Sequence, residues 1–93
     1  MPNVAQDPIM DDLRARITAA DADIVAAVNR RAALVAELHA HKRTQGYEVF
    51  DPAREEQVIS AALQASGGPL SEAGLRELYA VILSLCTREA ASS

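Results

Sequence analysis

The chain has 93 residues, of which 49% are hydrophobic and 3% aromatic, and its formal net charge is −4. This length fits one small domain, and an acidic balance argues against nucleic-acid or anionic-membrane binding. The single cysteine, Cys86, excludes an internal disulfide, and no apolar run is long enough to span a membrane. We expect one cytoplasmic, unprocessed domain over residues 1–93, with its core at about 8–89 and a frayed tail at 90–93.

The first predicted element is a very long helix over about residues 8–44. Asp7-Pro8 provides an N-cap and a proline at the first helical position, and no helix breaker follows until Gly46. Such a helix is about 50–55 Å long, which exceeds the diameter of a globule of this size. It must therefore pack against something outside its own short chain. An intertwined homodimer meets that need.

Two shorter helices follow, over about 52–65 and 72–89. Asp51-Pro52 repeats the N-cap and proline signal, Ser66-Gly67-Gly68-Pro69 ends the first of the two, and Ser71 can cap the second. Low aromatic content, frequent alanine and scattered β-branched residues agree with helix throughout. The predicted fold class is all-α, with three helices.

An unusual row of cations lies on the packing face of the long helix. Steps of four and three residues produce a heptad-type seam: Met10, Arg14, Ile17, Asp21, Ile24, Val28, Arg31, Val35, Leu38 and Lys42. Cations at packing positions are costly unless they are paired or bind an anion, although long side chains can also extend from a seam edge into solvent. The seam therefore indicates either an anion site or solvated seam edges.

Helix geometry limits which of these cations can act together. Arg31 and Lys42 are eleven residues apart, about 16 Å of rise on one face, so their side chains can reach one small molecule. Arg14 is about 25 Å of rise from Arg31, which is too far within one chain. An antiparallel pairing of two copies, with its two-fold axis near Ile24, would bring Arg14 of one chain to the other chain's site and create two shared sites.

Four segments together resemble the all-helical chorismate mutases, in matching order and spacing. They are Leu13-Arg14-Ala15-Arg16-Ile17, Asn29-Arg30-Arg31-Ala32-Ala33-Leu34-Val35, Lys42 and Phe50-Asp51-Pro52-Ala53-Arg54-Glu55-Glu56. The resemblance covers about residues 11–89. It implies three-helix chains woven into an antiparallel homodimer that converts chorismate to prephenate, toward phenylalanine and tyrosine, with no metal or organic cofactor.

The resemblance also implies roles for individual residues. Arg31 and the other chain's Arg14 would bind the two carboxylates, for which a guanidinium fork is well suited. Lys42 would reach the ether oxygen and a carboxylate. The ring end of the site would be formed by Asp51, Arg54 and Glu55. Glu55 would accept a hydrogen bond from the ring hydroxyl. Because the reaction is unimolecular, orientation and fixed charges would supply the catalysis.

The third predicted helix departs from the family pattern. Cys86 stands where a hydroxyl residue is common, and a thiol is a weaker donor. Four residues later, where the family has glutamine or glutamate for the ether oxygen, this chain has Ala90, with Glu89 beside it. If Glu89 is the donor it must be protonated, so the rate would fall as the carboxyl ionises. If neither Ala90 nor Glu89 donates to the ether oxygen, we expect modest turnover with Lys42 alone, or an activating partner protein that reshapes the end of the third helix.

Several other interpretations compete. His39 and His41 are about 200° apart on a helix, which argues against a shared metal. The basic run from His39 to Arg43 is too short to indicate nucleic-acid binding. The nearest functional alternative is a mutase or pyruvate lyase acting on an aminated chorismate or an isochorismate. An alternative of another class is a weakly active helical regulatory or interaction module, motivated by Cys86 and Ala90.

Overall fold

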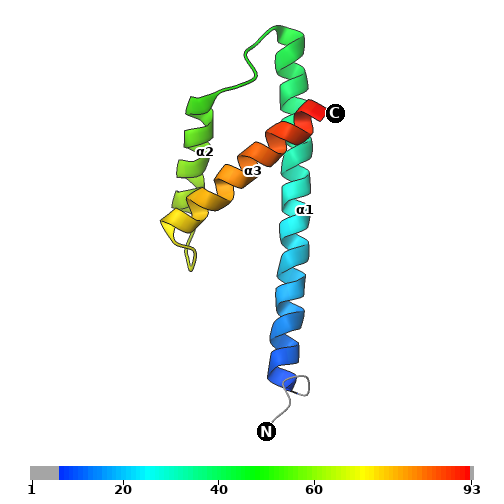
Figure 1. The fold of residues 1–93 in the computed structure, drawn as a ribbon, viewed down its shortest axis with the longest axis vertical. Helices are drawn as coiled ribbons and strands as arrows, with labels where there is room; N and C mark the ends of the chain where they lie inside the picture. Colours follow the sequence, from blue (N-terminus) through cyan, green and yellow to red (C-terminus); the bar gives the residue numbers. More distant parts are fainter. Residues whose placement is uncertain (1–6, 93) are drawn as a thin grey trace. The chain divides into compact units, whose positions relative to one another are not determined.

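The computed structural model describes residues 7–92 and contains three α-helices in this part of the chain (Figure 1). They are α1 (Pro8–Gln45), α2 (Pro52–Ala65) and α3 (Glu72–Ser92). The all-α prediction is confirmed, and the starts of the three helices fall where the sequence placed them. The chain divides into two compact units, one up to Arg30 and one from Arg31 onward, which are described separately.

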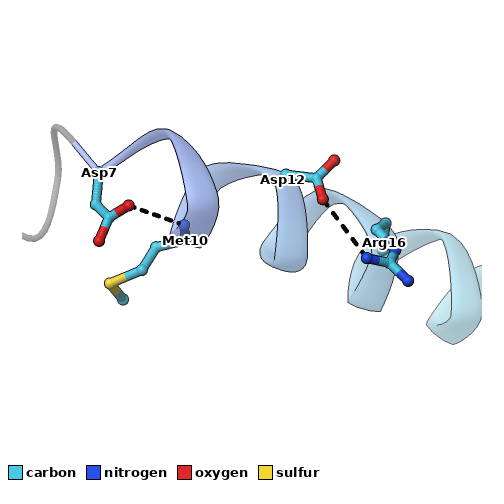
Figure 2. Close-up of polar contacts among 4 residues, drawn as sticks. All are labelled: Asp7, Met10, Asp12 and Arg16. Atoms are coloured by element: carbon cyan, nitrogen blue, oxygen red, sulfur yellow. Dashed lines mark hydrogen bonds and ion pairs between the residues drawn. The ribbon is translucent and has the colours of Figure 1, made fainter.

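The N-terminal unit contains the first part of α1, which begins at a capped end. The Asp7 Oδ1 atom accepts hydrogen bonds from the backbone N–H groups of Ile9 (2.9 Å) and Met10 (3.4 Å), as an N-cap side chain does. Figure 2 shows the bond from Met10. One turn on, Asp12 and Arg16 form an i,i+4 ion pair of 3.6 Å between exposed side chains. A pair this exposed adds little stability, so capping is the stronger local signal for where α1 begins.

This unit leaves large apolar side chains in contact with solvent. Ile9 is 70% exposed, Ile17 60% and Ile24 59%, and Leu13 and Val25 are also exposed. Burial of such side chains stabilises a protein by about 1.5–3 kcal/mol each. One helical segment has no second element against which to bury them, so this surface fits a helix that packs against another chain. The homodimer itself remains a prediction.

The C-terminal unit begins with the last part of α1, which ends in a Schellman motif. Gly46 adopts a positive φ of 73°, its N–H donates to the Arg43 carbonyl (3.2 Å), and the Tyr47 N–H donates to the Lys42 carbonyl (2.8 Å). These bonds satisfy two carbonyls at the end of the helix. The left-handed conformation, which glycine adopts without steric cost, turns the chain toward α2.

Both shorter helices start at side-chain caps. Asp51 Oδ1 accepts a hydrogen bond from the backbone N–H of Arg54 (3.1 Å), and Ser71 Oγ accepts one from the backbone N–H of Gly74 (3.0 Å). Pro52 occupies the first turn of α2, where its missing N–H costs nothing. Both predicted caps are confirmed.

Within this unit α2 and α3 pack against each other and bury a small core. The buried apolar residues are Leu75, Cys86 and Ala90, and His39 of α1 is also buried. Other apolar side chains at helical spacing on α2 and α3 are half-buried: Ile59, Ala62, Leu63, Ile82 and Leu85. Leu78 follows the same spacing on α3, but it is 45% exposed in the single chain. Helical spacing identifies an apolar face but not how much of it one chain can cover.

The end of α3 corrects the sequence prediction. We expected a helix to about residue 89 and a frayed tail at 90–93, but α3 continues to Ser92 and Ala90 is only 2% exposed. Alanine favours helix, and burial of Ala90 holds this last turn in place. Ser93 and residues 1–6 lie outside the described residues. Across residues 7–92, no helix is both long enough and apolar enough to span a membrane.

Candidate functional site

The C-terminal unit contains a cavity of about 290 Å³ that is lined by all three helices and by the connection between α1 and α2. Its walls combine apolar and charged side chains, as is usual in pockets for small molecules. The lining residues are Arg31, Leu34, Val35, Leu38, His39, Lys42, Val49, Phe50, Asp51, Arg54, Glu55, Val58, Leu83, Cys86 and Thr87.

The cavity brings together six of the eight residues that the sequence singled out as site residues. They are Arg31, Lys42, Asp51, Arg54, Glu55 and Cys86. The other two are placed elsewhere. Arg14 belongs to the N-terminal unit, where its side chain is exposed, and Glu89 is exposed on α3 and does not line the cavity.

Arg31 enters the cavity wall with an unsatisfied donor. Its Nη1 atom is buried, and within the described residues it has no hydrogen-bond partner. A buried donor without a partner costs about 1–3 kcal/mol, and more when the group is charged. In proteins an anion or an ordered water usually completes such a group, so this guanidinium is a candidate donor to an anion in the cavity.

Lys42 lies three turns along α1 from Arg31, as the seam predicted. Its Nζ donates a hydrogen bond of 3.3 Å to the Val49 carbonyl on the α1–α2 connection. This bond uses one of the three ammonium donors and holds the long side chain at the cavity wall. The two remaining donors are available to a ligand.

The first turn of α2 contributes the polar end of the cavity. The Asp51 cap fixes the start of the helix, so that Asp51, Arg54 and Glu55 all line the wall. Glu55 is half-buried, whereas Asp51 and Arg54 are exposed. The carboxylates of Asp51 and Glu55 can accept hydrogen bonds from a hydroxyl or amino group of a ligand. The positive charge of Arg54 beside them reduces their repulsion of an anion.

On α3, the cavity is lined by Leu83, Cys86 and Thr87. The Cys86 thiol is free and only 1% exposed. Thr87 has a hydroxyl group and lies one residue after Cys86, the position where the family commonly has a hydroxyl residue. Thr87 was not predicted as a site residue, because the residues before Cys86 match the family pattern and place the hydroxyl position at Cys86.

His39, like Thr87, is a polar lining residue that was not predicted as a site residue. It is 8% exposed, and its pKa is lowered from 6.5, first by desolvation and then by the positive charges of Lys42 and Arg43. The signal was present in the sequence, because His39 is three residues before Lys42 and eight after Arg31, on the same face of the helix. The sequence pattern was interpreted for His39 only in terms of metal and nucleic-acid binding. Within residues 7–92 no group of three or more potential metal-binding side chains comes together.

The charges of the lining residues indicate which kind of ligand the cavity can bind. Arg31, Lys42 and Arg54 supply positive charge, and Asp51 and Glu55 supply negative charge. Most of the other lining side chains are apolar. The cavity therefore suits a small molecule that combines anionic groups and a hydrogen-bond donor with an apolar part.

Comparisons with known proteins identify one family and one relative that the chain resembles. The family model of chorismate mutase type II matches residues 13–90. The chain is also similar to a protein of Streptomyces pristinaespiralis named 4-amino-4-deoxychorismate mutase, with 37% identity over 83 residues. That match covers 88% of this chain but only 64% of the relative's length.

Proposed function

The chain belongs to the chorismate mutase type II family, and from this membership and the cavity we propose that it is an isomerase that converts chorismate to prephenate. The family model spans nearly all of the described residues, including every residue that lines the cavity. The resemblance noted in the sequence is thereby confirmed at the level of the family. The substrate and the activity are our proposal.

The observation that carries the proposal is the buried, unpartnered Nη1 atom of Arg31 in a cavity that Lys42 also lines. Chorismate is a dicarboxylate, and a carboxylate oxygen would satisfy this donor. Desolvated cations attract an anion more strongly than the same groups would in water. A dianion bound in the cavity would satisfy this charged donor and remove that cost.

The reaction needs positioning and fixed charge rather than a nucleophile. One ether carbon–oxygen bond breaks as a carbon–carbon bond forms, and negative charge builds on the ether oxygen. Arg31 binds a carboxylate and selects the folded conformer, while Lys42 donates toward the ether oxygen and a carboxylate. Arg54, Glu55 and Asp51 hold the ring end, with Glu55 accepting from the ring hydroxyl. Cys86 closes the wall on α3.

We further propose that the enzyme is an antiparallel, intertwined homodimer with two shared sites. The exposed apolar side chains of α1 and the small core of one chain support a partner of the same kind. In such a dimer Arg14 of one subunit binds the second carboxylate in the other subunit's cavity, which supplies the charge that a dianion needs. A cytoplasmic location and an activating partner protein remain predictions.

A second candidate substrate is 4-amino-4-deoxychorismate, favoured by the name of the Streptomyces pristinaespiralis relative. The two substrates differ in one ring substituent, a hydroxyl or an amino group. Glu55 can accept a hydrogen bond from either, and a protonated amine would add charge attraction. Other contacts at the ring end must then decide the preference, because a site that pairs its buried polar groups with one substituent penalises the other.

The test is a direct activity assay of the purified chain with each compound. Loss of chorismate absorbance, with the product identified as phenylpyruvate after acid treatment, supports the first candidate. A higher kcat/KM with the amino compound supports the second. A third assay adds isochorismate and measures the release of pyruvate, which would indicate a pyruvate lyase. No turnover of any of them, with no other protein added, would contradict the proposal and favour a helical interaction module.

A further inference from the structure

His39 is a polar group in the cavity that the proposed mechanism does not yet use. It is the buried polar residue of the described chain, at 8% exposure, and it lines the cavity beside Lys42 one turn along α1. Residues 7–92 provide no hydrogen bond to its imidazole. A buried imidazole can donate from one ring nitrogen and accept at the other, so this side chain is available to a ligand.

The part of the cavity wall on α3 lacks a comparable long donor. Cys86 and Ala90 are one turn apart and both are buried, but only Cys86 lines the cavity. Cys86 carries a weakly donating thiol, Thr87 a short hydroxyl, and Ala90 a methyl group. Glu89 is turned to solvent and does not line the cavity. If the ether oxygen receives a second hydrogen bond, α1 is the better source of it.

The groups around His39 keep it neutral. On α1 it lies near Lys42 and Arg43, whose charges lower its pKa together with desolvation, and Arg31 lines the same wall. From α2 and its cap the cavity receives Asp51, Arg54 and Glu55, and from α3 the Cys86 thiol. A neutral imidazole between cations adds no further repulsion to the site. It keeps one N–H to offer to an oxygen that gains negative charge.

We propose that His39 is a catalytic residue that donates a hydrogen bond to the ether oxygen, alongside Lys42. This inference rests on the proposed function. As the ether bond breaks, its electron pair moves toward oxygen, which becomes the keto oxygen of the product while the new carbon–carbon bond forms. The imidazole proton stays on nitrogen throughout. In this proposal His39, on α1, is the second hydrogen-bond donor to the ether oxygen. The sequence had suggested Glu89, or no residue, for this role.

The test compares His39→Leu, which removes the donor, with His39→Gln, which keeps a neutral N–H donor. His41→Leu is the matched control, because His41 is exposed and two residues away. We expect kcat of His39→Leu to fall by about 10²–10³-fold with little change in KM, as for loss of one oxyanion donor. His39→Gln should recover much of this loss, and His41→Leu should behave as the parent. Circular dichroism confirms that each variant is folded.

Other results would separate the two ideas. If His39→Leu keeps the parent kcat while Lys42→Ala is inactive, the inference fails and the proposed function stands. If Glu89→Gln, and not His39→Leu, changes the rate and its pH profile, Glu89 is the donor and the inference fails. If the parent converts neither chorismate nor its amino analogue, the function fails and the inference with it.

A binding measurement covers the case in which His39→Leu does not fold. The parent has two histidines, so the ring ¹⁵N signals of His39 and His41 can be assigned with His41→Leu. On addition of prephenate, whose keto oxygen is the former ether oxygen, we expect the His39 ring signals to move and those of His41 to stay. Unchanged His39 signals at saturating prephenate would overturn the inference.

Discussion

Lys42 combines a fixed position with free donors. Its bond to the Val49 carbonyl holds the side chain at the cavity wall, and its remaining ammonium hydrogens are available to a bound oxygen. A compact ammonium suits a single developing charge, whereas the Arg31 guanidinium suits a planar carboxylate. In the proposed mechanism Arg31 and Lys42 therefore have different tasks.

This division predicts how two substitutions differ. Lys42→Ala should lower kcat by about 10²–10³-fold or more, because it removes a donor that acts on the transition state. Arg31→Ala should mainly raise KM, because carboxylate binding is lost in the ground state as well. Steady-state kinetics of both variants on the preferred substrate checks this. Equal effects on kcat and KM in the two variants would contradict the assigned roles.

His39 makes stability depend on pH. Its pKa in the folded protein is below the ordinary value of 6.5, so the unfolded chain binds more protons in the interval between the two. The stability that depends on neutral His39 is complete above about pH 6.5 and is lost as the pH falls through the lowered pKa. The melting temperature of the parent should therefore fall on acidification below pH 6.5 more steeply than that of His39→Gln. Parallel curves would show that His39 is not the cause.

The residues of the site could be predicted to different degrees. Arg31, Lys42 and the Asp51 to Glu55 turn were accessible, because helical spacing and a cap signal place them on the cavity wall. His39 and Thr87 were missed. Their roles depend on which side of α1 and α3 the cavity occupies, and spacing alone does not reveal that.

At the scale of the elements, caps decide where helices begin. Asp7, Asp51 and Ser71 each satisfy a backbone N–H of the first turn, and each was recognisable in the sequence. The end of α3 was less accessible, because the burial of Ala90 that extends it is a tertiary effect. Local chemistry fixes helix starts here, and packing fixes the last helix end.

Two caps provide a matched pair of substitutions. Ser71→Ala and Asp51→Ala should each cost about 1 kcal/mol of unfolding free energy, since each leaves an N–H of a helix start without its side-chain acceptor. Only Asp51 lines the cavity, so only Asp51→Ala should also lower kcat/KM. Denaturant unfolding and kinetics measure the two effects. A Ser71→Ala variant with reduced turnover but parent stability would contradict this separation.

At the scale of the whole molecule, one chain has little core of its own. Its buried apolar residues are few, whereas large apolar side chains along α1 are exposed. A helix of this length predicts a partner, but no pattern within one chain states which surfaces meet. That is why the homodimer remains a proposal although α1 itself could be predicted.

An obligate homodimer makes stability depend on concentration. Because association stabilises only the folded chain, the melting temperature should rise by several degrees over a hundredfold increase in protein concentration. Differential scanning calorimetry checks this, with sedimentation velocity at the same concentrations. A constant melting temperature together with a monomeric sedimentation coefficient would rule out the dimer.

The most direct test of the shared site mixes two inactive variants. Arg14→Ala and Lys42→Ala each damage both sites of their own homodimer, but a mixed dimer has one site that carries both substitutions and one that carries neither. After the two proteins are unfolded and refolded together, we predict that turnover returns to about one quarter of the parent value, because about half of the dimers are mixed and each has one intact site of two. A mixture that stays as inactive as its components, with mixed dimers shown by mass spectrometry, would contradict the account.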